Sequence, residues 1–337
     1  MELPPALAAY DLGPAPVVRP LPGGLINVTL LVEAPHGRFV LQRLHPVFAA
    51  EVNDDIDAIT AHLAARGLAT PRLVRTRAGA SSTREADGVW RLLTFVEGET
   101  VHRVESPARA EAAGALVGRF HAALVDLRHD FAFRRAGVHD TARHLALLDT
   151  AVDTHRAHPQ HDELAALRDE LRAGLAELPP IGPGLPRRIA HGDLKISNLL
   201  FAPDGRGVCL VDLDTLAEMP LPHELGDAWR SWCNPLGEDD PTARFELPLL
   251  AAAWRGYRSE IAISDEERAL LVPGVLAICL ELAARFARDA LEDAYFGWDP
   301  ARFASRAAHN LARARSQTAL HRSLRAQRGA AEAALTG

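Results

Sequence analysis

The block that most constrains the fold is AHGDLKISNLLF, residues 190–201. It places Asp193, Lys195 and Asn198 immediately before an apolar segment. A glycine turn and a second apolar segment follow, and that segment carries Asp212. Two short apolar segments around a turn predict a hairpin. The hairpin would return Asp212 to the side of the loop that holds Asp193 and Asn198.

These residue types at this spacing fit phosphoryl transfer from a nucleotide. Such a reaction uses a carboxylate to orient the attacking hydroxyl and take its proton, and oxygen ligands to hold Mg²⁺ against the phosphates. We expect Asp193 to be the base, and Asn198 and Asp212 to be the metal ligands. His191 would brace the loop, and Lys195 would reach the transferring phosphate as a point charge. An isolated Asp-x4-Asn pair is usually a turn, so the argument rests on the combination.

The composition restricts the setting in which this chemistry takes place. With 337 residues, 48% of them hydrophobic, the chain can form one large domain or two coupled lobes. A formal net charge of −7 argues against binding to nucleic acid. Its scattered cysteines fit a reducing compartment, and its longest apolar run, 270–280, is too short to cross a membrane. We therefore expect a cytoplasmic protein that acts on small molecules, with no membrane or nucleic-acid partner.

Residues 1–98 have the pattern of a small sheet with one helix. Residues 21–44 predict two strands around the turn Pro35–Gly37, and residues 89–98 predict another strand. Apolar residues at helical spacing predict a helix over 50–66.

Residues 99–337 have mostly helical patterns. Ser106 and Pro107 form an N-cap and first-turn pair, and Ser264 with Glu267 forms a capping box. The predicted helical stretches are 106–127, 141–178, 264–291 and the part after Pro300. The sequence thus predicts an α+β, bilobal molecule: a nucleotide-binding lobe over 1–98, a helical catalytic and acceptor-binding lobe over 99–337, and a cleft between them.

Motifs along nearly the whole chain resemble the aminoglycoside phosphotransferase and choline kinase family, which shares the protein-kinase-like fold. Within it, the pattern is most similar to the N-acetylhexosamine 1-kinases. The motifs are GGLINVT, FVLQRL, WRLLTFVEGET, HGDLKISNLLF, VDLDT and ELGDAWR. The resemblance implies ATP and Mg²⁺ as cofactors, the roles of Asp193, Asn198 and Asp212 given above, and a sugar acceptor phosphorylated on its anomeric hydroxyl.

On the nucleotide side, the turn with Gly23, Gly24 and Asn27 is expected to cover the phosphates. The segment TFVE is placed like the hinge whose backbone binds adenine, and it consists of Thr94, Phe95, Val96 and Glu97.

The strand FVLQR lacks the lysine that many kinases carry there. Alternation places Leu41 and Arg43 on one face, so Arg43 is the expected phosphate ligand, with Asp55 as its nearest acidic partner. The alternative is a solvated arginine at the end of a strand.

On the acceptor side, the resemblance implies that Arg285 and Tyr295 bind the sugar. This chain has one residue fewer before Tyr295, which in a continuous helix would rotate that side chain by about 100°. Asp227 and Arg230 either contribute to substrate binding or form a structural ion pair.

Two alternatives remain open at this stage. One is an aminoglycoside or amino-alcohol acceptor of the choline or homoserine type, for which Asp289, Glu292 and Asp293 could supply carboxylates. The other is a catalytically inactive kinase-like binding module. The joint presence of Asp193, Asn198 and Asp212 argues against the second.

Overall fold

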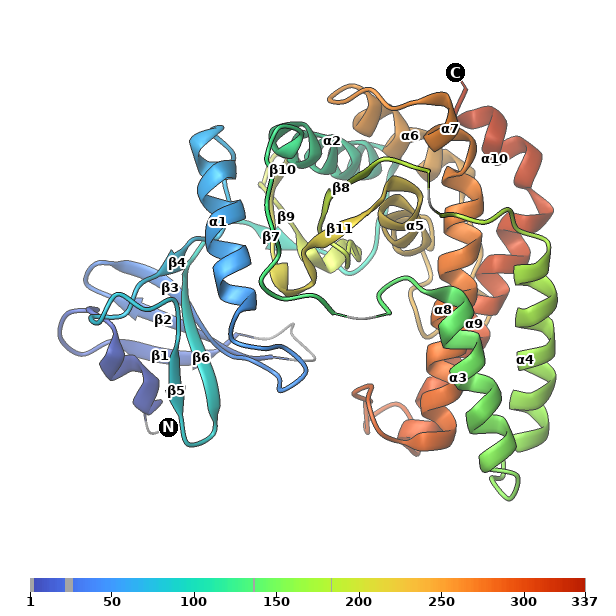
Figure 1. Cartoon of the computed structure of the whole chain (residues 1–337), viewed down its shortest axis with the longest axis horizontal. Helices are drawn as coiled ribbons and strands as arrows, with labels where there is room; N and C mark the ends of the chain where they lie inside the picture. Colours follow the sequence, from blue (N-terminus) through green and yellow to red (C-terminus); the bar gives the residue numbers. More distant parts are fainter. Residues whose placement is uncertain (1–2, 22–26, 136, 183, 337) are drawn as a thin grey trace.

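The computed structural model describes residues 3–21, 27–135, 137–182 and 184–336. Figure 1 shows a small lobe, made of a sheet with one long helix beside it, and a larger, mostly helical lobe. This is the bilobal α+β architecture that the sequence predicts. Residue 98 lies between strand β6 (Gly88–Thr94) and strand β7 (Glu99–Thr100), and β7 pairs with a strand of the large lobe.

The small lobe is built on an antiparallel sheet with the strand order β1–β2–β3–β6–β4, and β5 pairs with β6. Its other strands are β1 (Val17–Pro20), β2 (Val28–Ala34), β3 (Gly37–Arg43), β4 (Leu73–Val74) and β5 (Thr83–Glu85). Ala34 pairs with Gly37, so the predicted turn is confirmed. Strand β1 was not predicted, because Arg19 and Pro20 interrupt its apolar pattern.

The two faces of this sheet pack against different partners. On one face Leu41 and Leu92 are fully buried against the 3-10 turn η1 (Pro5–Ala9). Leu93 belongs instead to the main core, which also contains apolar residues of helix α1 (Val52–Ala65) and extends into the large lobe. Helix α1 therefore connects the sheet to the large lobe.

The large lobe consists mainly of helices around the buried helix α8 (Leu271–Glu292). The other helices are α2 (Pro107–Leu124), α3 (Thr141–Thr154), α4 (His161–Ala176), α5 (Leu221–Trp232), α6 (Leu247–Arg258), α7 (Asp265–Ala269), α9 (Arg306–Ala326) and α10 (Arg328–Ala334). Among the residues that the structure describes, no helix is long and apolar enough to span a membrane.

Short strands in the large lobe position the loop of residues 191–198. Strand β8 (Arg187–Ala190) pairs with β11 (Ala217–Pro220), and β9 (Leu199–Phe201) pairs with both β10 (Gly207–Leu210) and β7. The β9–β10 hairpin was predicted. Strands β8 and β11 were not, because charged residues and a proline interrupt their apolar patterns, RRIA and AEMP.

Two predicted helices are interrupted in the structure. The Ser264–Glu267 capping box is confirmed, but its helix α7 ends at Ala269 and α8 begins at Leu271. Pro273 lies in the first turn of α8, where its missing N–H costs no helical bond. The stretch 141–178 likewise contains two helices, α3 and α4, separated at residues 155–160, where Pro159 disfavours a continuous helix.

Candidate active site

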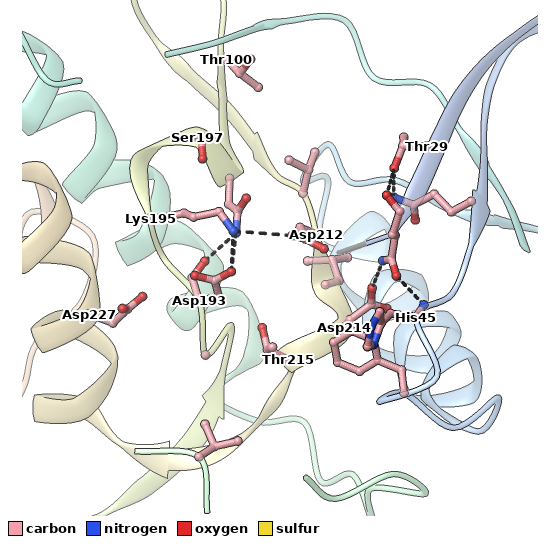
Figure 2. A pocket seen from close by; sticks show the side chains of 18 of the residues that line it. Thr29, His45, Thr100, Asp193, Lys195, Ser197, Asp212, Asp214, Thr215 and Asp227 are labelled. Carbon is pink, nitrogen blue, oxygen red and sulfur yellow. Dashed lines mark hydrogen bonds and ion pairs between the residues drawn. The ribbon is translucent and has the colours of Figure 1, made fainter. Parts of the chain in front are cut away.

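A cavity of about 500 Å³ lies between the lobes. It is lined on the small-lobe side by residues of β2, β3 and β6, and on the large-lobe side by the 192–198 and 211–215 segments and the second half of α8. Figure 2 shows the side chains that converge there, with Lys195 between Asp193 and Asp212. The structure thus brings together the residues of the sequence block that we expected to carry the chemistry.

The loop after β8 is anchored from behind by helix α5. The backbone N–H groups of His191 and Gly192 donate to the Glu224 carboxylate at 2.7 and 2.9 Å, and that of Leu194 donates to Asp227 at 2.6 Å. Glycine is required at position 192, since φ is 79° and a Cβ would lie 2.5 Å from the Thr215 carbonyl oxygen. Helix α5 therefore fixes the direction in which Asp193 points.

His191 and Asp227 are both part of this anchoring. The buried imidazole of His191 lies with its Nε2 2.9 Å from the Val211 carbonyl oxygen, one residue before Asp212. Asp227 also pairs with Arg230 at 2.9 Å, and both side chains are nearly buried while they line the cleft. The ion pair foreseen as an alternative for these two residues is thus present.

Asp193 and Lys195 form an ion pair at the centre of the cleft. Lys195 Nζ lies 2.7 Å from Asp193 Oδ2 and 3.8 Å from Asp212 Oδ2. Burial opposes ionisation of Asp193, but the Lys195 ammonium outweighs it and lowers the Asp193 pKa to about 2. Burial instead raises the pKa of Asp212, and the neighbouring carboxylates of Asp214 and Asp193 add to that effect. Asp193 is therefore a carboxylate at neutral pH.

Asn198 and Asp212 present oxygens that suit a hard cation. Asn198 donates its Nδ2 to the Asp193 backbone carbonyl at 2.8 Å, which leaves its Oδ1 available. Asp212 makes no side-chain hydrogen bond to a described residue, and its backbone is left-handed with φ 64°. Non-glycine residues in this conformation are uncommon and concentrate at functional sites. One carboxylate and one carboxamide oxygen match the way in which proteins hold Mg²⁺ beside phosphates.

The expected nucleotide-side residues divide into three groups. Gly23 and Gly24 lie outside the described residues. Asn27, Thr94, Phe95 and Val96 line the cleft. Glu97 does not line it; its exposed side chain pairs with Arg38.

The structure does not bring Arg43 into the cleft. Its guanidinium pairs with Asp87 at 2.8 Å and lies over the Trp90 ring, and the Arg43 side chain is 36% exposed. The face of β3 that carries Leu41 and Arg43 packs away from the cleft, and Gln42 on the opposite face lines it. This placement corrects our expectation and argues against Arg43 as a phosphate ligand. Asp55, its suggested partner, contacts residues 129–133 instead.

A different arginine, Arg91 on β6, is buried beside the segment of residues 212–215. It makes five hydrogen bonds: two to Gln42, one to Asn53 and one to each oxygen of Asp214. Asn27 donates to the same Asp214 carboxylate at 2.6 Å. Since a guanidinium has five N–H donors, Arg91 is saturated by the protein. Its hydrogen bonds to Asp214 connect the small-lobe sheet to the turn that follows Asp212.

One feature of the sequence points to Arg91, although this residue was not among the predicted site residues. VWRLLT is an apolar strand with one arginine in its interior, and a charge there must find a partner. The partner, Asp214, lies two residues after Asp212 but 123 residues from Arg91. Periodicity alone does not reveal such a pairing.

Replacing Arg91 with Lys should destabilise the protein by about 1–3 kcal/mol, because a single ammonium cannot satisfy Asp214, Gln42 and Asn53 together. The matched control is Arg43→Lys on the neighbouring strand, whose exposed pair with Asp87 should contribute within about 0.5 kcal/mol. Thermal and urea unfolding of both variants would measure the difference. Equal losses in the free energy of unfolding for the two variants would contradict a role of Arg91 in connecting the lobes.

Arg285 and Tyr295, the two residues expected to bind the acceptor, line the cleft and both lie beside Phe296. The Arg285 guanidinium lies 5.5 Å from the centre of the Phe296 ring and 3.9 Å from Glu281, and it makes no hydrogen bond to a described residue. The ring of Tyr295 meets Phe296 edge-on at 4.9 Å. Both residues thus reach the same end of the cavity.

The one-residue shortening before Tyr295 does not rotate that side chain about a helix. Helix α8 ends at Glu292, and Asp293 adopts φ 53°. Asp289 then accepts hydrogen bonds from the backbone N–H groups of residues 294, 295 and 296. Of the three carboxylates considered for a cationic acceptor, Asp289 is therefore structural, while Glu292 pairs with Arg288 and Asp293 lies near Arg306.

The fold and the cleft are those of a kinase-like phosphotransferase, and comparison with known proteins agrees. The phosphotransferase enzyme family model, APH, matches residues 17–263, and the chain belongs to this family. It is 29% identical over 276 residues to a homoserine kinase of Xanthobacter autotrophicus, covering 80% of this chain and 79% of that protein.

Solved structures with the same fold include two kinases of small molecules. A microcompartment-associated aminopropanol kinase has a TM-score of 0.67 at 20% identity, covering 96% of this chain and 97% of that one. The amicoumacin kinase hAmiN, in complex with AMP-PNP, Ca²⁺ and Ami, has a TM-score of 0.64 at 16% identity, covering 93% of this chain and 90% of that one. The chain is a small-molecule phosphotransferase that acts on a hydroxyl. Its specific resemblance to N-acetylhexosamine kinases is not among these findings.

Proposed function

We propose that this chain transfers the γ-phosphate of ATP, bound with Mg²⁺, to the anomeric hydroxyl of an N-acetylhexosamine or a related sugar. The observation that supports the sugar is the position of the Arg285 guanidinium beside the Phe296 ring, which Tyr295 meets edge-on in the same cleft. An aromatic side chain and a guanidinium with several N–H donors suit a neutral sugar that carries hydroxyl and carbonyl oxygens.

The charges at this end of the cleft support a neutral acceptor over a polycation. Asp227 and Glu238 both pair with Arg230 at 2.9 Å. Buried Glu281 accepts from Thr141 at 3.2 Å and lies 3.5 Å from His139. An aminoglycoside would need unpaired carboxylates here, and the described acidic residues at this end already have partners.

In this proposal Asp193 orients the acceptor hydroxyl and receives its proton. A carboxylate with a pKa of about 2 is a weak base. A hemiacetal hydroxyl is more acidic than an ordinary alcohol, and phosphoryl transfer relies mainly on positioning and charge stabilisation. Lys195, between Asp193 and Asp212, would stabilise charge on the transferring phosphoryl group.

The nucleotide would lie between β6 and the 193–212 region. Phe95 already donates its N–H to the Arg38 carbonyl at 3.1 Å, whereas Val96 has no backbone partner among the described residues. We therefore assign the adenine-edge contact to the Val96 backbone. Asp212 and Asn198 would hold Mg²⁺, which when bound neutralises charge on the phosphates.

Homoserine is the second candidate, because homoserine kinases are relatives at 29% identity over most of the chain. Its carboxylate would pair with the fork of Arg285 as readily as a sugar oxygen would. The two candidates share the base, the metal ligands and the nucleotide site, and they differ only at the acceptor.

An acceptor screen that follows ADP release would test the proposal. The wild-type protein would be supplied with ATP, Mg²⁺ and, in turn, N-acetylglucosamine, N-acetylgalactosamine, homoserine, an amino alcohol and an aminoglycoside. We expect the highest kcat/KM with an N-acetylhexosamine. Turnover of homoserine without turnover of either sugar would overturn the sugar assignment.

Replacing Arg285 with Ala should raise the acceptor KM by a factor of about 10–150, the effect of losing a hydrogen bond to a charged group. The ATP KM and the melting temperature should change little. The control is Arg288→Ala on the same helix, because Arg288 pairs with Glu292 at 2.8 Å and does not line the cleft. A fall in melting temperature with equal damage to both KM values would instead assign Arg285 a structural role.

A further inference from the structure

The segment between helices α2 and α3 is described at residues 125–135 and 137–140, and these residues contact both lobes. In Figure 1 it runs from α2, along the side of the large lobe that faces α1, to α3. Asp55 of α1, 2% exposed, accepts hydrogen bonds from the His129 ring at 2.7 Å and from the Ala132 and Phe133 N–H groups at 2.8 and 2.9 Å. Phe133 also meets Phe48 of the small lobe edge-on at 6.2 Å. A small-lobe helix therefore holds the first half of a large-lobe segment.

The second half of the segment forms a wall of the cleft, where Arg135, Gly137, Val138 and His139 line the cavity. The segment ends at Asp140, the N-cap of α3, whose side chain accepts from the Arg143 N–H at 2.9 Å. Residues 129–133 and Asp140 are thus held in place, and the described residues between them line the cleft.

His139 marks this wall as a strained part of the backbone. It has φ 53°, a conformation that few non-glycine residues adopt. Its side chain is 7% exposed, neither ring nitrogen has a hydrogen-bond partner among the described residues, and Nδ1 lies 3.5 Å from Glu281 of α8. Backbone strain of this kind persists where surrounding contacts enforce it, often at ligand-binding sites.

Arg135 projects from this wall toward Tyr295. It donates one hydrogen bond to the Tyr295 hydroxyl at 3.0 Å, and its guanidinium lies 6.0 Å from the Tyr295 ring and 5.9 Å from Phe48. No described carboxylate pairs with it. Since a guanidinium has five donors, most of its hydrogen-bonding capacity is not used by the residues that the structure describes.

Arg135 and Arg285 each lie beside one ring of the adjacent pair Tyr295 and Phe296. Each guanidinium lies beside one of the adjacent rings, Arg135 at Tyr295 and Arg285 at Phe296, and neither is hydrogen-bonded to a described carboxylate. Two guanidinium groups that line one cavity, with N–H donors left free by the described residues, suit a ligand with oxygen acceptors on more than one side.

We propose that Arg135 binds the acceptor and that Asp55 is the positioning residue that holds it there, so that the small lobe takes part in acceptor selection. This rests on the proposed function only in taking this end of the cleft as the acceptor site. The acceptor class is a compact molecule with several hydroxyl, carbonyl or carboxylate oxygens. The positive charges of Arg135 and Arg285 would repel a polycation.

Calorimetric titration tests this without depending on turnover. N-acetylglucosamine, homoserine and kanamycin would each be titrated into the wild-type protein and its variants in the presence of ADP and Mg²⁺. For whichever neutral or zwitterionic compound binds, Arg135→Met should raise the acceptor Kd by at least about tenfold, as expected for losing a hydrogen bond to a charged group. The ADP Kd should stay within about twofold, because Arg135 contacts Tyr295 and Phe48 and none of the residues assigned to the nucleotide.

The matched control is Arg134→Met, since Arg134 pairs with exposed Asp130 at 2.8 Å and does not line the cleft. Asp55 is buried, so its link to Arg135 is tested with His129→Ala, which removes one of the three bonds to Asp55. His129→Ala should raise the acceptor Kd and leave the ADP Kd unchanged, a separation that general destabilisation would not give.

The outcomes separate the two proposals. Binding of homoserine but not of the sugar would overturn the sugar assignment and leave the role of Arg135 to be decided on homoserine. An unchanged acceptor Kd in Arg135→Met would overturn this inference and leave the proposed function standing. Tighter binding of kanamycin than of the other two compounds would overturn the acceptor class, and binding of none of the three would overturn both.

Discussion

Replacing Asp193 with Asn should lower kcat by about 10²–10⁴, the usual contribution of a general base. The carboxylate is oriented by its bonds from Lys195 and Asn198, and the loop that carries it is fixed to α5. Asparagine keeps the size of the side chain and one oxygen, so the loop should stay in place. The effect would therefore report the lost proton acceptor.

The measurement is kcat and both KM values from ADP release with the preferred acceptor. The ATP KM should change little, since Asp193 acts on the acceptor hydroxyl. Asp204→Asn is the control, because Asp204 is an exposed residue of the β9–β10 turn that pairs with Arg206. Near wild-type turnover in Asp193→Asn would remove this residue from the mechanism.

Replacing Asp212 with Ala should abolish the dependence of nucleotide binding on Mg²⁺, and with it the activity. Asp212 is the carboxylate of the cleft that makes no side-chain hydrogen bond to a described residue, and Asn198 Oδ1 is the second oxygen proposed for the metal. The ADP Kd would be measured with Mg²⁺ and with a chelator. The wild type should bind more tightly with the metal, and the variant should show one value under both conditions.

The left-handed backbone at Asp212 requires a second variant. Alanine is strained at φ 64°, whereas asparagine tolerates this region. Asp212→Asn therefore keeps the backbone and removes the charge. If it retains the full Mg²⁺ response, the metal has been placed on the wrong carboxylate.

The central motif could be predicted because its parts lie close together in the sequence. A loop, a hairpin and the spacing from Asp193 to Asp212 depend on local geometry, and the β9–β10 hairpin forms as expected. The helix caps at Ser106 and Ser264 are also local signals, and both are confirmed.

The position of the cationic residue on the sheet could not be predicted in the same way. Strand β3 is apolar at Phe39, Val40 and Leu41, so alternation does not show which face meets the cleft. The burial of Leu41 under η1 decides it, and η1 lies about thirty residues earlier in the chain. Arg43 therefore points away, and Arg91 occupies the inner position.

The contacts that connect the lobes were equally inaccessible from the sequence. Arg91 with Asp214 and Asp55 with residues 129–133 each join segments more than seventy residues apart. Each is a polar group that becomes interpretable only once its buried partner is known. Fold class and catalytic motif follow from local patterns, whereas the contacts between the lobes depend on tertiary structure.

The most direct test of the central claim is phosphorus NMR of a single reaction mixture. Wild-type protein, ATP, Mg²⁺ and N-acetylglucosamine would be followed over time, with Asp193→Asn in parallel. We predict a new resonance of a sugar phosphate on the anomeric oxygen that grows in step with ADP, and that is absent over the same period with the variant. ADP that accumulates with inorganic phosphate alone, or a product that forms equally fast without the Asp193 carboxylate, would contradict the account.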